Sequence, residues 1–169
     1  MKLILINCLI YFLTFNFRQE PLSQVALIKV PNKVQKINNA EAVLFIQKNF
    51  DKPRMNSRLK NMYKTGSIII GFEDYERSSP MDLDELKERT LGNMEEIRAA
   101  GTNDEVDIIN IKGKKFFIHK RHKSDEYLFN FISEPKNNKG LKGGVLFKKA
   151  DSLKANEVLK TLLSNIVFK

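Results

Sequence analysis

The chain has 169 residues, of which 42% are hydrophobic and 29% are charged, and its formal net charge at pH 7 is +9. This composition is close to the globular average, which excludes a wholly disordered chain and a protein with many membrane spans. A chain of this length forms a single domain with its own hydrophobic core as the default. The positive charge makes acidic partners possible but specifies no activity by itself.

The first 18 residues have the pattern of a secretory leader. Lys2 precedes a mostly apolar run, residues 3–17, which Arg18 follows. A membrane-spanning helix needs about 20 apolar residues, whereas the apolar part of a signal peptide has about 7 to 15. We therefore predict a signal peptide over residues 1–18 and a single exported domain, periplasmic or secreted, over residues 19–169. No small-residue cleavage motif precedes Arg18, so an uncleaved membrane anchor at residues 3–17 is the alternative.

The single cysteine, Cys8, lies inside this leader. Removal of residues 1–18 would leave a domain without cysteine and with a net charge of +7. Thiol nucleophiles, disulfides and cysteine-based metal sites would then be excluded, and the domain would depend on its hydrophobic core.

The first half of the remaining chain combines short strands with a basic connection. Residues 22–37 alternate loosely and predict a first strand or edge. The apolar run 40–50 does not distinguish a strand from a helix, and we favour a strand. Residues 51–64 are basic and predict a connecting loop or one irregular turn of helix. The β-branched run 67–72 predicts a strand that is buried on both faces.

Two amphipathic helices are predicted from apolar residues that recur at spacings of three and four. The first covers residues 80–100, with Ser79-Pro80 as a typical start, Gly101 as a typical end and an acidic outer face. The second covers residues 152–167, with Asp151 or Ser152 as its cap.

Between the two helices, short apolar segments separated by turn residues predict an antiparallel meander. A loop is expected at residues 135–140, and the glycine-rich segment 140–144 is expected to be a flexible hairpin loop. The resulting fold class is α+β, an antiparallel β-sheet flanked by two amphipathic helices. The predicted strands of the meander are residues 106–111, 115–122, 126–133 and 143–149.

Over residues 65–169 the chain resembles the PsbP-like superfamily, which includes the extrinsic P subunit of photosystem II and bacterial envelope proteins of the DcrB type. The resemblance implies an α/β/α sandwich and a binding or assembly role without catalysis. It is carried by the segments Gly66-Ser-Ile-Ile-Ile-Gly-Phe72, Met81-Asp-Leu-Asp-Glu-Leu86, Thr90-Leu91, Gly144-Val-Leu-Phe147, Ala155-Asn-Glu-Val-Leu159 and Leu163-Ser-Asn-Ile-Val-Phe168.

No catalytic residue, metal site or cofactor is predicted. His119 and His122 are the two histidines, and residues three apart on a strand point to opposite faces, so the two rings cannot share a metal ion. A small secreted hydrolase or nuclease that uses His119 or His122 is kept as an alternative function. A third hypothesis is a partner protein that neutralises a toxin.

The predicted partner-binding site is a basic surface on the meander. Its aromatic neighbours would also suit a nucleic-acid platform, but exposed strand faces and edges use lysine for solubility, and an exported protein seldom meets nucleic acid. We therefore expect an acidic protein or an anionic envelope polymer as the partner, with membrane contact only through an uncleaved leader. The predicted site residues are Lys112, Lys114, Lys115, Lys120, Arg121, Lys123, Lys142 and Lys148.

Overall fold

The computed structural model describes residues 17–20, 23–31, 33–51, 55, 59–77, 82–98 and 103–169. The predicted leader lies almost entirely outside these residues. The helices of the described chain are α1 (Asn39–Asn49), α2 (Leu83–Arg98) and α3 (Ser152–Ser164), with a short 3₁₀-helix, η1 (Lys149–Asp151). Its strands are β1 (Phe17–Glu20), β2 (Ala26–Pro31), β3 (Gln35–Ile37), β4 (Asn61–Thr65), β5 (Ile68–Glu76), β6 (Asn103–Ile111), β7 (Lys114–Lys123), β8 (Glu126–Ser133), β9 (Lys139–Lys148) and β10 (Ile166–Phe168).

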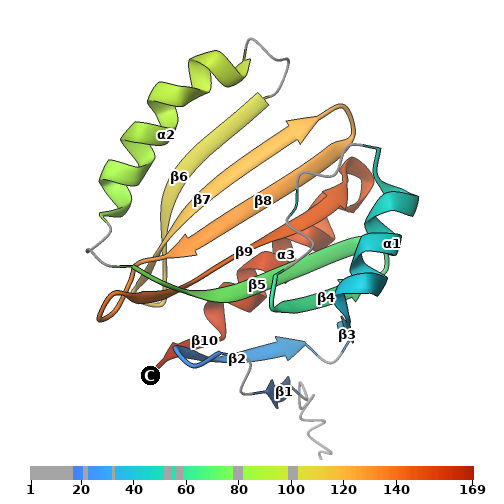
Figure 1. Cartoon of the computed structure of the whole chain (residues 1–169), viewed down its shortest axis with the longest axis horizontal. Helices are drawn as coiled ribbons and strands as arrows, with labels where there is room; N and C mark the ends of the chain where they lie inside the picture. Colours follow the sequence, from blue (N-terminus) through green and yellow to red (C-terminus); the bar gives the residue numbers. More distant parts are fainter. Residues whose placement is uncertain are drawn as a thin grey trace, which may run out of the picture.

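The predicted α+β fold is confirmed, and the main sheet is antiparallel throughout. Its seven strands follow the order β3-β4-β5-β9-β8-β7-β6, and β1, β2 and β10 form a second, three-stranded sheet. Helix α3 lies behind the main sheet in Figure 1, while α1 and α2 lie in front, near opposite edges. The sequence predicts two flanking helices, and the described residues contain three.

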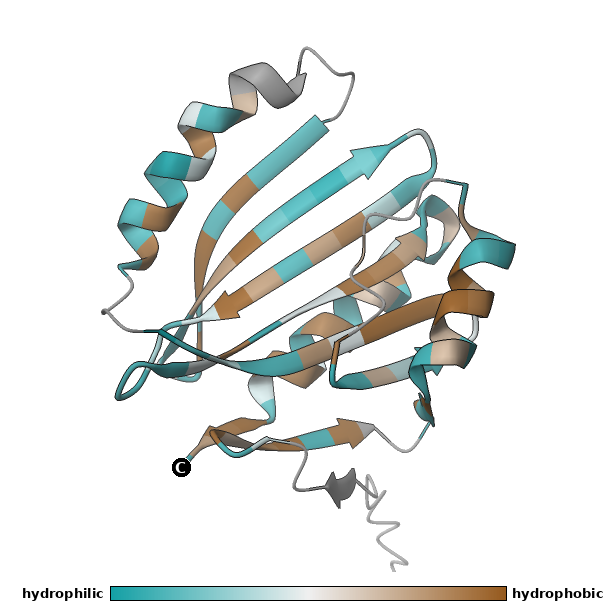
Figure 2. Cartoon of the chain, in the orientation of Figure 1, coloured by the Kyte–Doolittle hydropathy of each residue, from teal (hydrophilic) through white to brown (hydrophobic). Residues whose placement is uncertain are grey.

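Each face of the main sheet has its own hydrophobic core. On one face, termed the α3 face, Phe72, Phe116 and Phe147 are fully buried beneath α3 and β2. On the opposite face, termed the α1 face, Leu146 packs with residues of α1 such as Ile46. Figure 2 shows the hydrophobic first half of β5 in the sheet centre and the hydrophilic second half of β7 near the edge. Because successive strand residues alternate between the faces, β7 carries buried and charged side chains within one strand.

The segment predicted as a strand over residues 40–50 is instead helix α1. The side chain of Asn38 accepts a hydrogen bond from the backbone N–H of Glu41, and the Glu41 carboxylate accepts one from the backbone N–H of Asn38. This capping box fixes the helix start, and Ala42 and Ile46, four residues apart, are buried against the sheet. The loop predicted over residues 51–64 also ends early, because residues 61–64 belong to β4, which pairs with β5 across a turn at Gly66.

The C-terminal helix is confirmed but ends at Ser164 rather than at Val167. Ile166–Phe168 forms β10 and pairs with β2 from the beginning of the domain. The apolar stripe of a helix and the apolar residues of a following strand merge in the sequence, so periodicity does not show the break. Asp151 is the N-cap position but makes no capping hydrogen bond; it accepts one from the Ser67 hydroxyl instead.

The predicted meander is confirmed: β8 has the predicted bounds, and β6, β7 and β9 are longer than expected. Residues 139–144, predicted as part of a loop, belong to β9. Its glycines make room for aromatic rings on neighbouring strands: a Cβ at Gly140 would lie 2.5 Å from the Tyr75 ring, and one at Gly143 would lie 2.7 Å from Phe131. The predicted first helix is confirmed as α2, while its expected start at Ser79-Pro80 and end at Gly101 lie outside the described residues. No described helix is long and apolar enough to cross a membrane.

Candidate functional site

The basic residues predicted as one partner-binding surface are divided between two ends of the meander. Lys114 and Lys115 begin β7, whereas Lys120, Arg121 and Lys123 lie in its second half. A strand of 10 residues is about 30 Å long, so the two groups lie far apart. The two strands that carry these cations, β7 and β9, are also not adjacent, because β8 lies between them. Alternation along each strand further distributes the cations over both faces of the sheet.

Several of the predicted site residues are neutralised by carboxylates on neighbouring strands. The more exposed lysine pairs among them hold side chains in place but contribute little to stability, whereas the carboxylate of the Arg121–Asp104 pair is 0% exposed. The paired lysines are also less available to an acidic partner, because each already has an anion at contact distance. The pairs are Lys120–Glu105 (3.2 Å), Arg121–Asp104 (3.3 Å), Lys142–Glu73 (3.1 Å) and Lys148 with both Asp125 and Glu126 (3.4 Å each).

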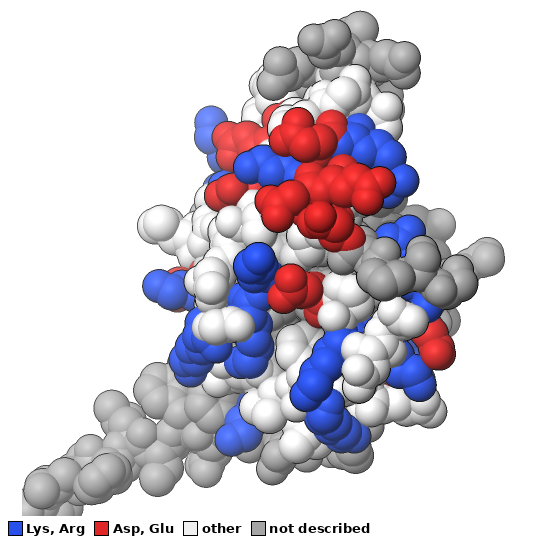
Figure 3. Space-filling view, turned by 90° about the vertical axis from the view of Figure 1, so that its left-hand side faces the viewer, with Lys and Arg blue, Asp and Glu red and all other residues white. Residues whose placement is uncertain are grey.

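A second group of lysines carries uncompensated charge. Lys112, Lys114 and Lys115 surround the β6–β7 turn and make no ion pair with a described residue. The adjacent turn between β8 and β9 adds Lys136, and a hydrogen bond from the Glu134 backbone N–H to the Lys115 carbonyl joins the two segments. We call these four lysines the turn lysines. Figure 3 shows Lys and Arg side chains gathered below the acidic outer side of α2.

The turn lysines lie in or next to two tight turns, β6–β7 and β8–β9. Lys112 and Gly113 have positive φ angles of 51° and 75°, and Asn137 and Asn138 have 52° and 62°. Two successive residues with positive φ are typical of the two-residue hairpin turn that matches strand twist. The turn lysines therefore project from two short, closed hairpins.

At the other end of β7, a buried carboxylate organises the basic residues. The Asp104 side chain is 0% exposed, and its Oδ2 atom lies 2.9 Å from Nε2 of His119 and 3.3 Å from Nε of Arg121. The contact with Arg121 lacks the geometry of a hydrogen bond, so Arg121 Nε and Asp104 Oδ1 have no hydrogen-bond partner within the described part of the chain. Asp104 therefore holds the guanidinium by charge and His119 by a hydrogen bond.

His119 is neutral at pH 7 in this environment. Burial lowers the pKa of His119 below its ordinary value of 6.5; the hydrogen bond and the charge of Asp104 oppose this shift, and the charge of Arg121 adds to it. A neutral imidazole next to a carboxylate must donate, so Nε2 carries the proton toward Asp104.

The second histidine belongs to the opposite face. His122 stacks on Tyr127 with ring centroids 4.8 Å apart, and Tyr127 stacks in turn on Phe147 in the core of the α3 face. The two histidines thus point to opposite sides of β7, as the strand period predicts, and do not form a joint catalytic pair.

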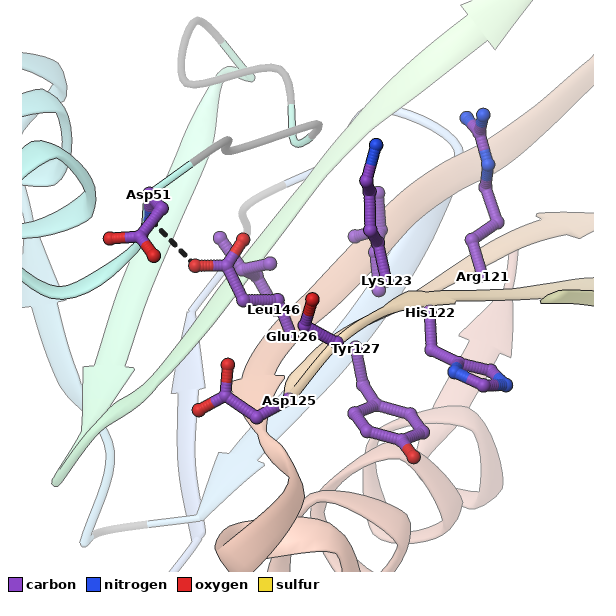
Figure 4. Close-up of a pocket in the computed structure, with 10 residues that line it drawn as sticks. Asp51, Arg121, His122, Lys123, Asp125, Glu126, Tyr127 and Leu146 are labelled. Atoms are coloured by element: carbon purple, nitrogen blue, oxygen red, sulfur yellow. Dashed lines mark hydrogen bonds between the residues drawn. The ribbon is translucent and has the colours of Figure 1, made fainter. Parts of the chain in front are cut away.

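A pocket of about 160 Å³ lies beside the β7–β8 turn. Arg121, Leu128 and Leu146 are neighbours in one row of the strand register across β7, β8 and β9. The two leucines are 3% and 2% exposed and form an apolar base. Lys123 lies two residues beyond Arg121 and therefore on the same face. In Figure 4 both cationic side chains extend to the same side of the strand.

Acidic residues bound the opposite side of this pocket. Asp51 follows α1, and its backbone N–H donates a hydrogen bond of 2.6 Å to Oε1 of Glu126. Asp125 and Glu126 both contact Lys148. The Asp51 carboxylate makes no ion pair with a described residue, and it lies on the side away from Arg121 in Figure 4. The pocket thus separates positive from negative charge across a base of leucine.

Sequence reasoning missed Asp104, which lies 15 residues from its histidine partner. The signal was present in the turn: a two-residue hairpin turn at Lys112-Gly113 fixes the register that places Asp104 opposite Arg121. It also missed Asp51, which approaches Glu126 only because α1 packs on the sheet beside the start of β8. No group of three or more metal-ligating side chains occurs among the described residues.

No family model and no curated protein matches this chain. A solved structure does: the solution structure of cyanobacterial PsbP (CyanoP) from Synechocystis sp. PCC 6803 has a TM-score of 0.51 at 7% sequence identity, covering 85% of this chain and 86% of that chain. The PsbP-like fold implied by the sequence resemblance is therefore confirmed. Similarity at this level of identity concerns the fold and transfers no partner or activity.

Proposed function

We propose that this chain is a non-enzymatic binding or assembly protein that docks an acidic protein or an anionic polymer through the turn lysines, Lys112, Lys114, Lys115 and Lys136. The observation that carries the proposal is that these four lysines lie together without ion pairs among the described residues, whereas Lys120, Arg121, Lys142 and Lys148 each have an acidic partner. This narrows the docking surface to one end of the sheet.

Electrostatics and backbone geometry both support this surface. Because these lysines have no ion pair with a described residue, their positive potential extends into the solvent. This potential attracts an acidic partner and sets its orientation. The tight turns hold the four lysines close together, so docking costs less backbone ordering than it would on a long loop. The leader-like residues 1–18 lead us to propose that docking takes place after export, in the periplasm or outside the cell.

A catalytic alternative receives less support. A hydrolase or nuclease based on both histidines would need them in one site, and they lie on opposite faces of the sheet. A site based on His119 alone also receives little support, because its imidazole contacts the Asp104 carboxylate and its side chain is only 14% exposed. The toxin-neutralising hypothesis is a special case of docking to another protein and stays a prediction.

The test compares two variants that carry the same charge change at different places. Lys112→Glu/Lys114→Glu/Lys115→Glu alters the turn lysines, and Lys29→Glu/Lys60→Glu/Lys160→Glu alters exposed lysines elsewhere. Each substitution changes the charge by two, so both variants have a formal charge of +3 instead of +9. We expect the first variant to elute from immobilised polyglutamate at a clearly lower NaCl concentration than the second. Equal elution of the two variants would show that net charge alone determines binding and would refute the proposed surface.

A further inference from the structure

We infer that the pocket beside the β7–β8 turn binds an ω-amino carboxylate, a ligand with a carboxylate and an ammonium group joined by an aliphatic chain. A lysine at the C-terminus of a peptide has this chemistry. The inference rests on the order of groups across the pocket: cations on β7, leucines at the base and carboxylates on the far side. It is independent of the turn lysines, which lie at the other end of the sheet.

Arg121 and Lys123 provide the site for the ligand carboxylate. Asp104 contacts the Nε side of Arg121 and limits its movement, while the side chain remains 28% exposed toward the pocket. An arginine that is already oriented binds a carboxylate with little further loss of entropy. Lys123 makes no ion pair with a described residue, so its charge is available on the same face.

Leu128 and Leu146 provide the site for the aliphatic chain. Both side chains are almost fully buried, yet both line the pocket, so its base is apolar. Water at such a base cannot complete its hydrogen bonds, and methylene groups can replace it favourably.

The acidic side provides the site for the ligand ammonium group. The Asp51 carboxylate is exposed and has no cationic partner among the described residues, and Asp125 lies nearby with only Lys148 to compensate it. A simple anion would be repelled by this side, and a simple cation would be repelled by Arg121 and Lys123. A ligand that carries both charges at its two ends satisfies both sides.

The same charges favour a peptide end over free lysine. In free lysine the α-ammonium group adjoins the carboxylate and would approach Arg121 and Lys123. In a peptide that nitrogen is a neutral amide, so the repulsion is absent. We therefore assign a C-terminal lysine, rather than the free amino acid, as the chemistry that this pocket recognises.

The first experiment titrates the full chain with 6-aminohexanoate, hexanoate and hexylamine and follows backbone amide NMR signals. We expect 6-aminohexanoate to shift the signals of Arg121, Lys123 and Leu146 with a Kd on the order of 1 mM, as for a ligand of this size. Each probe with a single charge should bind at least about fivefold more weakly, since it loses one ion pair. Equal binding of the three probes, or no shift at concentrations on the order of 10 mM, would overturn the inference.

The second experiment removes one charge of the site at a time. Lys123→Gln and Asp51→Asn should each weaken 6-aminohexanoate by about fivefold, whereas Lys123→Gln should not weaken hexylamine and Asp51→Asn should not weaken hexanoate. The controls Lys112→Gln and Glu88→Gln change charges outside the pocket and should have no effect. Variants of the pocket that bind like the controls would refute the assignment.

The third experiment identifies the source of the ligand. Ala-Ala-Lys should bind more tightly than free lysine and more tightly than the same peptide with a C-terminal amide. Equal binding of the peptide and its amide would refute recognition of the carboxylate. Tighter binding of free lysine would refute the peptide terminus as the ligand.

Discussion

Replacement of Asp104 tests whether a buried carboxylate organises the end of β7. Its side chain is 0% exposed and contacts both His119 and Arg121. In Asp104→Ala the guanidinium loses its counter-ion and the imidazole loses its acceptor, while both groups stay in the protein. In Asp104→Asn the amide oxygen can still accept the hydrogen bond from His119, but the charge opposite Arg121 is lost.

The expected cost follows from the burial of the groups left behind. Removal of one partner from a fully buried ion pair costs about 3–5 kcal/mol. Arg121 and His119 keep 28% and 14% of their side chains exposed, so water can partly solvate them after the change. We therefore expect Asp104→Ala to lower the free energy of unfolding by about 2–3 kcal/mol and Asp104→Asn to lower it by about 1 kcal/mol. The larger loss is a substantial part of the typical stability of about 5–15 kcal/mol.

The measurement is urea unfolding followed by far-UV circular dichroism, since the chain contains no tryptophan. A matched control is Glu105→Gln on the same strand, whose carboxylate pairs with Lys120 at 3.2 Å but is 73% exposed. An exposed pair should change stability by less than about 0.5 kcal/mol. Similar losses for Asp104→Ala and Glu105→Gln would refute the reasoning, because burial would then make no difference.

Three further changes should alter the free energy of unfolding. Below pH 6.5 the protein should lose stability, because burial lowers the pKa of His119 in the folded protein, while His119 in the unfolded chain takes up a proton near pH 6.5. The urea midpoint should therefore fall between about pH 7 and about pH 5. In His119→Gln this contribution to the pH dependence of the midpoint should be absent. Gly143→Ala should cost about 2–3 kcal/mol in the same assay, since a Cβ would lie 2.3 Å from the Gly71 carbonyl oxygen, whereas Gly92→Ala has open space and should be neutral or stabilising. Asn38→Ala should cost about 1 kcal/mol of thermal or urea stability through loss of the cap of α1.

Each of these expectations has an opposite outcome. An unchanged pH dependence in His119→Gln would contradict the role of its burial. A stable Gly143→Ala protein would contradict the close strand packing at β9. An Asn38→Ala variant as stable as the original chain would mean that packing on the sheet alone determines where α1 begins.

Local patterns in the sequence were sufficient for the elements whose signals are local. The spacing of apolar residues predicts α2, and the turn residues at Lys112-Gly113 and around Ser124 predict the hairpins of the meander. These signals depend on neighbours within a few residues, so tertiary contacts did not change them. The PsbP-like fold follows from the order of the same elements and is confirmed by the structure.

Other elements depended on contacts that are distant in the sequence. Residues 166–168 form a strand because β2, from the start of the domain, offers them an edge. Residues 139–144 form a strand because they pair with β5 and β8, and their glycines leave room for the rings of Tyr75 and Phe131. From local signals alone, the spacing of apolar residues extends the helix into the first segment, and the glycines predict a loop for the second.

The charged residues of the meander show the same difference between local and long-range information. The sequence shows how many cations the meander carries and which of them share a face, because strand periodicity is local. It does not show which of them are neutralised, since an ion pair requires two side chains within about 4 Å and the acidic partners come from other strands. Strand register pairs Asp104 with Arg121 and Glu73 with Lys142, and it leaves the turn lysines without partners among the described residues. Ion pairs between strands thus leave the turn lysines unpaired among the described residues at one end of the meander and a pocket of mixed charge at the other end.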